Sequence, residues 1–174
     1  MQATFAPRDI TLRDGRSVKV RAVLPSDEEE ILQAFDRMGA DARYMRFMSA
    51  RQHVNVERLR SVLASFPDKG FAIAATVPAP DGIDIVGSSS YMLEADGKRC
   101  EFAISIADAW NGAGLGRRMM EALIEAAQQR GLAEMKGFVL AANAPMLGLA
   151  QRVGFKVSRD PEDFSVRIVT RALG

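Results

Sequence analysis

The sequence has 174 residues, of which 48% are apolar and 26% are charged, which is the composition of one ordinary globular domain. Proteins that bind polyanions are usually strongly basic, whereas the formal net charge here is only +1. We therefore do not expect nucleic acid as the principal partner. No apolar run approaches the length of a membrane span, and a single cysteine and a single histidine exclude an internal disulfide and leave no recognisable zinc or Ser-His-Asp site.

The first part of the chain predicts one strand and two helices. Residues 17–24 alternate apolar and polar side chains as a strand does. Ser26, followed three positions later by Glu29, predicts a capping box at the start of a helix that ends before Gly39. A second helix is expected at about residues 56–66. No signal-peptide core precedes these elements, and we therefore expect a cytoplasmic protein.

Two strands at residues 71–77 and 83–94 are expected to form a hairpin around the loop 78–82, which contains proline and glycine. Residues 156–158 and 164–170 predict a closing pair of strands. No repeat or change of composition divides the chain, so all 174 residues are interpreted as a single domain, with about the first eight loosely ordered.

The most informative segment is a strand, a glycine-rich loop and a helix in direct succession. Residues 100–107 alternate in the strand period, which places Cys100 on the core face and Glu101 on the opposite face. The loop 111–116 carries three alternating glycines, and the helix that follows from Leu115 repeats apolar residues at helical spacing. Glycine lets a ligand approach the main chain, and the first N–H groups of a helix favour an anion, so this junction predicts a phosphate site.

Two better-known phosphate loops do not fit this segment. A P-loop needs Lys and then Ser or Thr after its last glycine, and neither follows Gly116. The dinucleotide fingerprint needs Gly-x-Gly-x-x-Gly near the start of a βαβ unit, whereas the spacing here is Gly-x-Gly-x-Gly, deep in the chain.

A second motif lies downstream. Residues 137–142 predict a strand that stops at Asn143, a residue type that caps helices, and Pro145 suits the first turn of the helix beyond it. That helix is expected to end at Gly154-Phe155.

Over about residues 100–156, the two motifs together resemble the acetyl-CoA-binding motifs of the GNAT superfamily of N-acetyltransferases. In that family a loop written Gln/Arg-x-x-Gly-x-Gly/Ala holds the CoA diphosphate through main-chain amides. Here Asn111, Gly114 and Gly116 stand at the defining positions, with Asn as a mild departure. The order strand, Asn143, short helix and Gly-Phe is similar to the family's second CoA-contacting motif.

The resemblance implies the mixed α+β GNAT fold: a twisted, mostly antiparallel sheet of about six to seven strands, splayed at the acetyl-CoA site and flanked by about four helices. It implies acetyl-CoA as co-substrate, no metal and an amine acceptor, with pantetheine held chiefly by backbone groups. The residues implied to bind the cofactor are Ile104, Ser105, Ile106, Asn111, Gly112, Ala113, Gly114, Leu115, Gly116, Arg117 and Asn143.

Glu101 is the candidate general base, which takes a proton from the attacking amine. It belongs to the strand face away from the core, beside the expected position of pantetheine. The alternative interpretation is a surface glutamate at a strand end. Ser105 is interpreted as a packing residue or a water ligand rather than a nucleophile, because no base for it is evident.

The sequence departs from the family at the proton donor for the departing thiolate. Many members carry a tyrosine five residues before the Phe of Gly-Phe, and here that position is Ala150. Tyr44, Tyr91 and water are the remaining candidates. Cys100 is interpreted as a small buried residue rather than an acyl carrier, because the alternation places it on the core face.

A narrower likeness concerns the acceptor. The segments Leu12–Gly15 and Arg43–Met48 resemble the acetyltransferase domain of bacterial protein-lysine acetyltransferases. A small-molecule amine remains an alternative to a protein lysine. The alternative function is a CoA-binding sensor or assembly domain without catalysis, which the missing tyrosine favours, whereas Glu101 and the intact loop favour an enzyme. A homodimer is compatible with either function.

Overall fold

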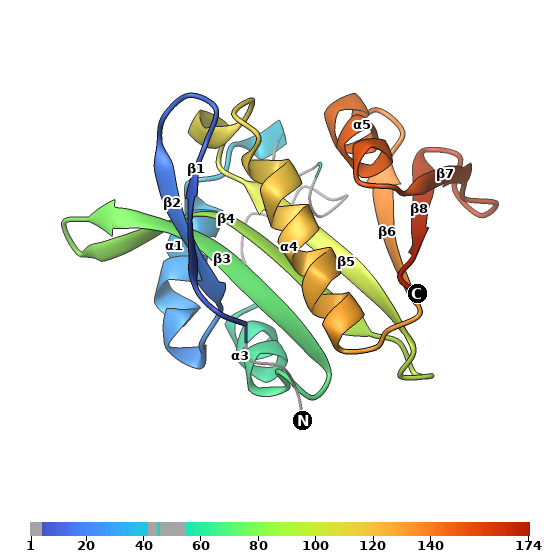
Figure 1. The fold of residues 1–174 in the computed structure, drawn as a ribbon, viewed down its shortest axis with the longest axis horizontal. Coiled ribbons are helices and arrows are strands. Elements are labelled where there is room, and N and C mark those ends of the chain that lie inside the picture. Colours follow the sequence, from blue (N-terminus) through green and yellow to red (C-terminus); the bar gives the residue numbers. More distant parts are fainter. Residues whose placement is uncertain (1–4, 42–44, 46–54) are drawn as a thin grey trace.

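The computed structural model describes residues 5–41, 45 and 55–174, which form one eight-stranded sheet with helices on both faces (Figure 1). The strands are β1 (Arg8–Thr11), β2 (Ser17–Ala22), β3 (Gly70–Ala79), β4 (Gly82–Leu93), β5 (Arg99–Ile106), β6 (Glu134–Leu140), β7 (Lys156–Arg159) and β8 (Val166–Ala172). The described α-helices are α1 (Glu28–Asp36), α3 (Val56–Ala64), α4 (Leu115–Gln129) and α5 (Ala144–Arg152).

The order of the strands across the sheet is β1-β2-β3-β4-β5-β6-β8-β7. Every neighbouring pair is antiparallel except β5 and β6, which run parallel. The expected hairpin of β3 and β4 is confirmed, with Ala79 opposite Gly82 at its turn. The closing pair of β7 and β8 is confirmed as well.

Helix α4 builds the core on one face of the sheet, as its apolar spacing predicts. Leu115, Met119 and Leu123 are at most 1% exposed, while Arg117 and Glu121 point away from the sheet and are exposed. The helix ends at Gln129, Arg130 is its C-terminal capping residue, and Gly131 follows with a φ of 84°. Within the residues that the structure describes, no helix is both long and apolar enough to cross a membrane.

The cap expected at the start of α1 was wrong. Ser26 does not cap α1: residues Pro25–Asp27 form a 3-10 turn, and Asp27 is the residue before the helix. The Asp27 carboxylate instead accepts a hydrogen bond from the Leu24 N–H at 2.7 Å and forms an ion pair with Arg21 at 2.8 Å. These bonds fix a turn that begins at Leu24, which a search for Ser or Thr at the first position of a capping box does not find.

Strand β1 was not expected, and it brings the sheet to eight strands rather than six or seven. It has only four residues, of which Ile10 alone is buried, so it shows too little alternation to be recognised. Phe5, which precedes it, packs on Phe71 with the ring centroids 5.8 Å apart. Residues 1–4, which were also expected to be loosely ordered, lie outside the described part of the chain.

Candidate active site

The sheet opens between β5 and β6. These parallel strands pair only at their beginnings, from Arg99 with Glu134 to Glu101 with Lys136. Strand β5 continues unpaired on this side to Ile106, and β6 continues to Leu140 while pairing with β8 on its other side. The resemblance implied a splayed sheet, and the register places the divergence immediately after Glu101.

The glycine loop stands at the far end of β5. Gly112 and Gly114 have φ values of 83° and 91°, a region that residues with a side chain rarely adopt. Gly114 is the residue before α4, so the loop leads directly to the unpaired N–H groups of that helix. Gly116 is needed for packing, because a Cβ there would lie 3.2 Å from Cδ2 of Leu149 on α5.

A large cleft of about 1350 Å³ joins the glycine loop to the opening between β5 and β6. Its wall contains the candidate base and all but one of the residues expected to bind the cofactor. These lining residues are Glu101, Ile104, Ser105, Ile106, Asn111, Gly112, Ala113, Gly114, Gly116, Arg117 and Asn143. Leu115 does not line the cleft: its side chain is 1% exposed and belongs to the core under α4.

Asn143 caps α5 as the sequence predicts. Its side-chain oxygen accepts a hydrogen bond from the Met146 N–H at 3.3 Å, and Pro145 lies in the first turn of the helix. The cap places Asn143 at the end of β6, on the opposite side of the large cleft from β5. This position accounts for its local structural role, and a contact with the cofactor stays a prediction.

Glu101 has an exposed side chain on the sheet face opposite to α4. Its register partner on β4 is Met92, and the same face continues along the pairs Ser90 with Ala103 and Ser88 with Ser105. Neighbouring Lys136 is engaged elsewhere, with its Nζ 2.5 Å from Glu94. Within residues 5–41, 45 and 55–174, no ion pair involves Glu101, so its carboxylate is available to a ligand.

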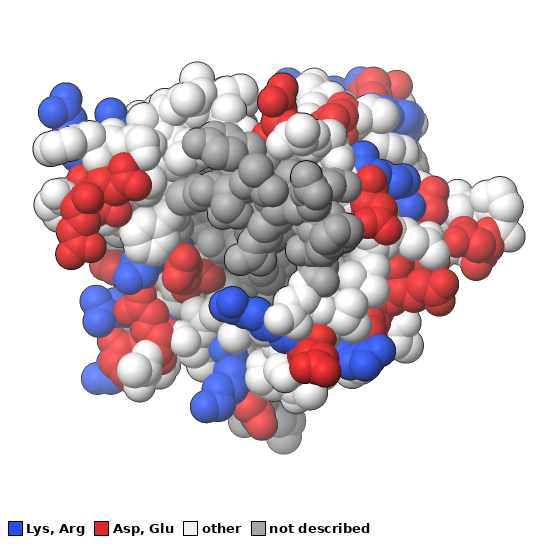
Figure 2. Space-filling view, turned by 180° about the vertical axis from the view of Figure 1, so that it is seen from behind, with Lys and Arg blue, Asp and Glu red and all other residues white. Residues whose placement is uncertain are grey.

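A small cavity of about 290 Å³ lies on this same face, between β4 and the helices α1 and α3. Its walls are mainly apolar, with Phe35 from α1 and Leu63 from α3, and the serines of β4 line its base. Ser105 and Ile106 belong to both the small cavity and the large cleft. On this face of the molecule, acidic side chains form several small groups with basic side chains between them (Figure 2).

The candidate proton donors differ in burial and in their position relative to the large cleft. Tyr91 is 2% exposed and does not line the large cleft, and burial raises the pKa of its hydroxyl. Ala150 is fully buried, and Tyr44 lies outside the described residues. Cys100 is fully buried as expected, and burial raises the pKa of its thiol to about 12, which excludes a reactive thiolate near neutral pH.

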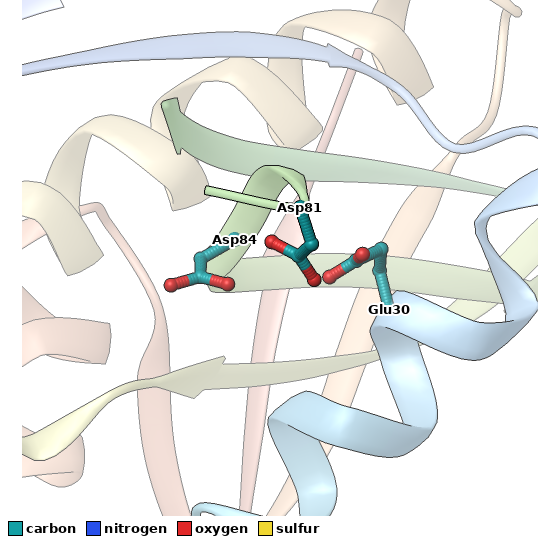
Figure 3. A group of neighbouring side chains, drawn as sticks. All are labelled: Glu30, Asp81 and Asp84. Atoms are coloured by element: carbon teal, nitrogen blue, oxygen red, sulfur yellow. The ribbon is translucent and has the colours of Figure 1, made fainter. Parts of the chain in front are cut away.

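Three carboxylates meet outside both cavities, a group that the sequence analysis did not find. Glu30 on α1 approaches Asp81 and Asp84 at the β3–β4 turn, with one oxygen from each within 4.8 Å of the others (Figure 3). Burial, and then the negative charges of Asp81 and Asp84, raise the pKa of Glu30. Arg37 compensates part of this charge, with its Nη1 3.7 Å from Asp84.

Sequence comparisons agree with this geometry. A family model described as an acetyltransferase (GNAT) domain matches residues 18–156. An acetyltransferase of Pseudomonas aeruginosa is 30% identical over 161 residues, which are 92% of this chain and 86% of that protein. Acetyltransferase Pat of Mycolicibacterium smegmatis is 25% identical over 157 residues, or 88% of this chain, and the chain spans only 46% of Pat.

Solved structures share the fold. The GNAT domain of S. lividans PAT superposes with a TM-score of 0.86 at 22% identity, over 95% of this chain and 96% of that domain. An acetyltransferase from Salmonella typhimurium, solved with its cofactor acetyl-CoA, superposes with a TM-score of 0.73 at 18% identity, over 90% of this chain and 94% of that protein. The family model and the Pseudomonas relative together establish that the chain belongs to the GNAT acetyltransferase family.

Proposed function

We propose that the protein transfers the acetyl group of acetyl-CoA directly to a primary amine, with the amine provided by a protein lysine or by a small molecule. One observation carries this proposal. A single cleft connects the glycine loop before α4, the unpaired edge of β5 and the carboxylate of Glu101. A phosphate site, a channel for an extended arm and a base are the three things that acetyl transfer from CoA requires.

The residues present fit acetyl-CoA. The positive φ values of Gly112 and Gly114 leave main-chain N–H groups open to a diphosphate, and the first turn of α4 favours its negative charge. The separation of β5 from β6 leaves strand edges to which the amide groups of pantetheine can hydrogen-bond. The bound co-substrate would supply a thioester carbonyl beside Ile104–Ile106, where backbone N–H groups stabilise the charge that develops on oxygen.

Acetyl transfer forms a C–N bond and breaks the C–S bond of the thioester. A protonated acceptor amine loses one proton before it attacks and a second as the amide forms, with one net proton released to solvent. We assign this proton removal to Glu101, directly or through a water molecule. The sulfur must gain one proton, and the described wall of the large cleft contains no tyrosine to provide it. We therefore assign that proton to water or to Tyr44, and a Tyr44→Phe variant with wild-type turnover selects water.

The acceptor is proposed to approach from the small cavity. Ser105 and Ile106 line both spaces, so an amine in the small cavity reaches the acetyl group from the face that carries Glu101. Among the relatives, an L-methionine sulfoximine/L-methionine sulfone acetyltransferase of Pseudomonas aeruginosa matches at 38% identity over 58 residues, or 33% of this chain. It favours including amino-acid amines beside lysine peptides as candidate acceptors.

A panel of lysine peptides, amino acids and polyamines, incubated with acetyl-CoA and the protein, tests the proposal. We expect release of free CoA together with a mass increase of one acetyl group on at least one acceptor. Binding of acetyl-CoA without turnover on any member of the panel would instead favour the non-catalytic sensor or assembly domain. Absence of acetyl-CoA binding would contradict both functions.

A further inference from the structure

The turn between β1 and β2 is hydrogen-bonded to the glycine loop and to the residues just before it. The Arg13 N–H donates to the Ala113 carbonyl at 3.2 Å, and the Arg13 Nη2 donates to the Gly112 carbonyl at 3.1 Å. Arg16 Nη1 donates to the Ala109 carbonyl at 2.8 Å, just before the loop. These contacts connect the first hairpin to a segment that lies about a hundred positions away in the sequence, a distance at which no sequence pattern relates them.

The two arginines of this turn are in different electrostatic situations. Arg16 is neutralised by Asp14, whose carboxylate lies 2.7 Å from its Nη2, and its guanidinium stacks 4.1 Å from the centroid of Trp110. Arg13 lines the large cleft and uses one side-chain nitrogen for Gly112. In the described part of the chain, no carboxylate forms an ion pair with Arg13, so a free cation remains at the loop.

The guanidinium of Arg13 lies beside Gly114. A Cβ on Gly114 would lie 3.4 Å from Nε of Arg13, so the guanidinium lies against the main chain at the start of α4. The guanidinium, the glycine loop and the first turn of α4 therefore all border the large cleft. Arg117, the arginine expected to bind the cofactor, also lines the large cleft and donates from its Nε to Glu121 at 3.0 Å.

We propose that Arg13 binds the diphosphate of acetyl-CoA, as a side-chain ligand that the β1–β2 turn supplies to the main-chain loop. The inference rests on the proposed function, because it takes acetyl-CoA as the ligand of the large cleft. A guanidinium presents planar pairs of N–H groups that match phosphate oxygens, and hydrogen bonds between charged partners are the strong ones. Its bond to Gly112 holds it in place before the ligand arrives.

The experiment compares two ligands and four variants. Calorimetry measures the Kd for acetyl-CoA, and turnover measures the KM for S-acetylpantetheine, which carries the thioester and the pantetheine arm but no phosphate. The variants are Arg13→Gln, Arg13→Lys, Arg16→Gln and Arg8→Gln. Arg16→Gln removes a loop contact without removing a free cation, and Arg8→Gln removes a charge on the same hairpin that is paired with Glu125 outside the cleft.

Arg13→Gln is expected to raise the Kd for acetyl-CoA by about 10- to 100-fold, which is the loss of affinity expected when a hydrogen bond to a charged group is removed. The KM for S-acetylpantetheine should stay unchanged. Arg13→Lys should lie closer to the wild type, Arg16→Gln should have a smaller effect, and Arg8→Gln should have none. An unchanged Kd in Arg13→Gln, an equal loss for both ligands, or an equal loss in Arg16→Gln would overturn the inference and leave the function standing. A wild type that binds no acetyl-CoA would overturn the function itself.

Discussion

The glycine loop lines the large cleft, and the small cavity shares Ser105 with that cleft, yet the loop and the small cavity are built from different kinds of structure. The loop is a run of consecutive residues whose main chain forms the binding surface, held by the β1–β2 turn. The small cavity is made of side chains from α1, α3 and the strands β3, β4 and β5, which come from separate parts of the sequence. We infer that the co-substrate is recognised by local backbone geometry and the acceptor by the tertiary assembly of side chains.

This difference predicts that transfer and co-substrate binding can be lost separately. Glu101→Gln keeps the size of the side chain but removes the base, so kcat should fall by about 10²- to 10⁴-fold while the Kd for acetyl-CoA stays unchanged. Part of the activity should return at high pH, where more of the acceptor amine is already neutral. Wild-type turnover across the pH range would show that another group removes the proton.

Gly114→Val should instead weaken the binding of acetyl-CoA. The substitution forces a β-branched residue to a φ of 91°, moves Arg13 and covers the main chain, so affinity for acetyl-CoA should fall by about tenfold or more. Gly131→Val is the matched control, because Gly131 has a φ of 84° at the other end of α4 and no neighbour within 4 Å. Calorimetry should detect the loss in Gly114→Val only. An equal loss in both variants would indicate general destabilisation.

Asn143→Ala tests whether the second wall of the large cleft is structural. Loss of the cap to Met146 should lower the free energy of unfolding by about 1 kcal/mol in the absence of ligand. Asn143→Ser, which keeps a capping oxygen, should recover most of the stability. If chemical denaturation shows no change while the Kd for acetyl-CoA rises, then Asn143 acts on the co-substrate rather than on α5.

Glu30→Gln should have the smallest effect and should concern stability alone. The folded protein raises the pKa of Glu30, so the contribution of this group is present at low pH and is lost as the pH rises through its folded pKa. Removal of the charge should therefore raise the melting temperature at pH 7, and the gain should disappear toward about pH 4. Glu29→Gln, an exposed change in the same helical turn, controls for the helix dipole.

The same contrast explains which features could be predicted from the sequence. The strand, loop and helix around residues 100–130 depend on local periodicity and on glycine conformation, and the structure has them where they were expected. The cap at Asn143 is equally local. The contacts of Arg13, the group of Glu30, Asp81 and Asp84, and the small cavity all depend on residues brought together by folding, which no short pattern encodes.

Trp110 provides the most direct test that acetyl-CoA binds at the glycine loop. It is the only tryptophan in the chain, and it stacks on Arg16 beside the loop. Acetyl-CoA is titrated into the wild type while Trp110 emission and the heat of binding are both recorded. Binding at the glycine loop predicts a saturable change in emission with the same midpoint as the heat, and loss of both in Gly114→Val. Heat of binding without any change in emission, retained in Gly114→Val, would show that the co-substrate does not bind at the glycine loop.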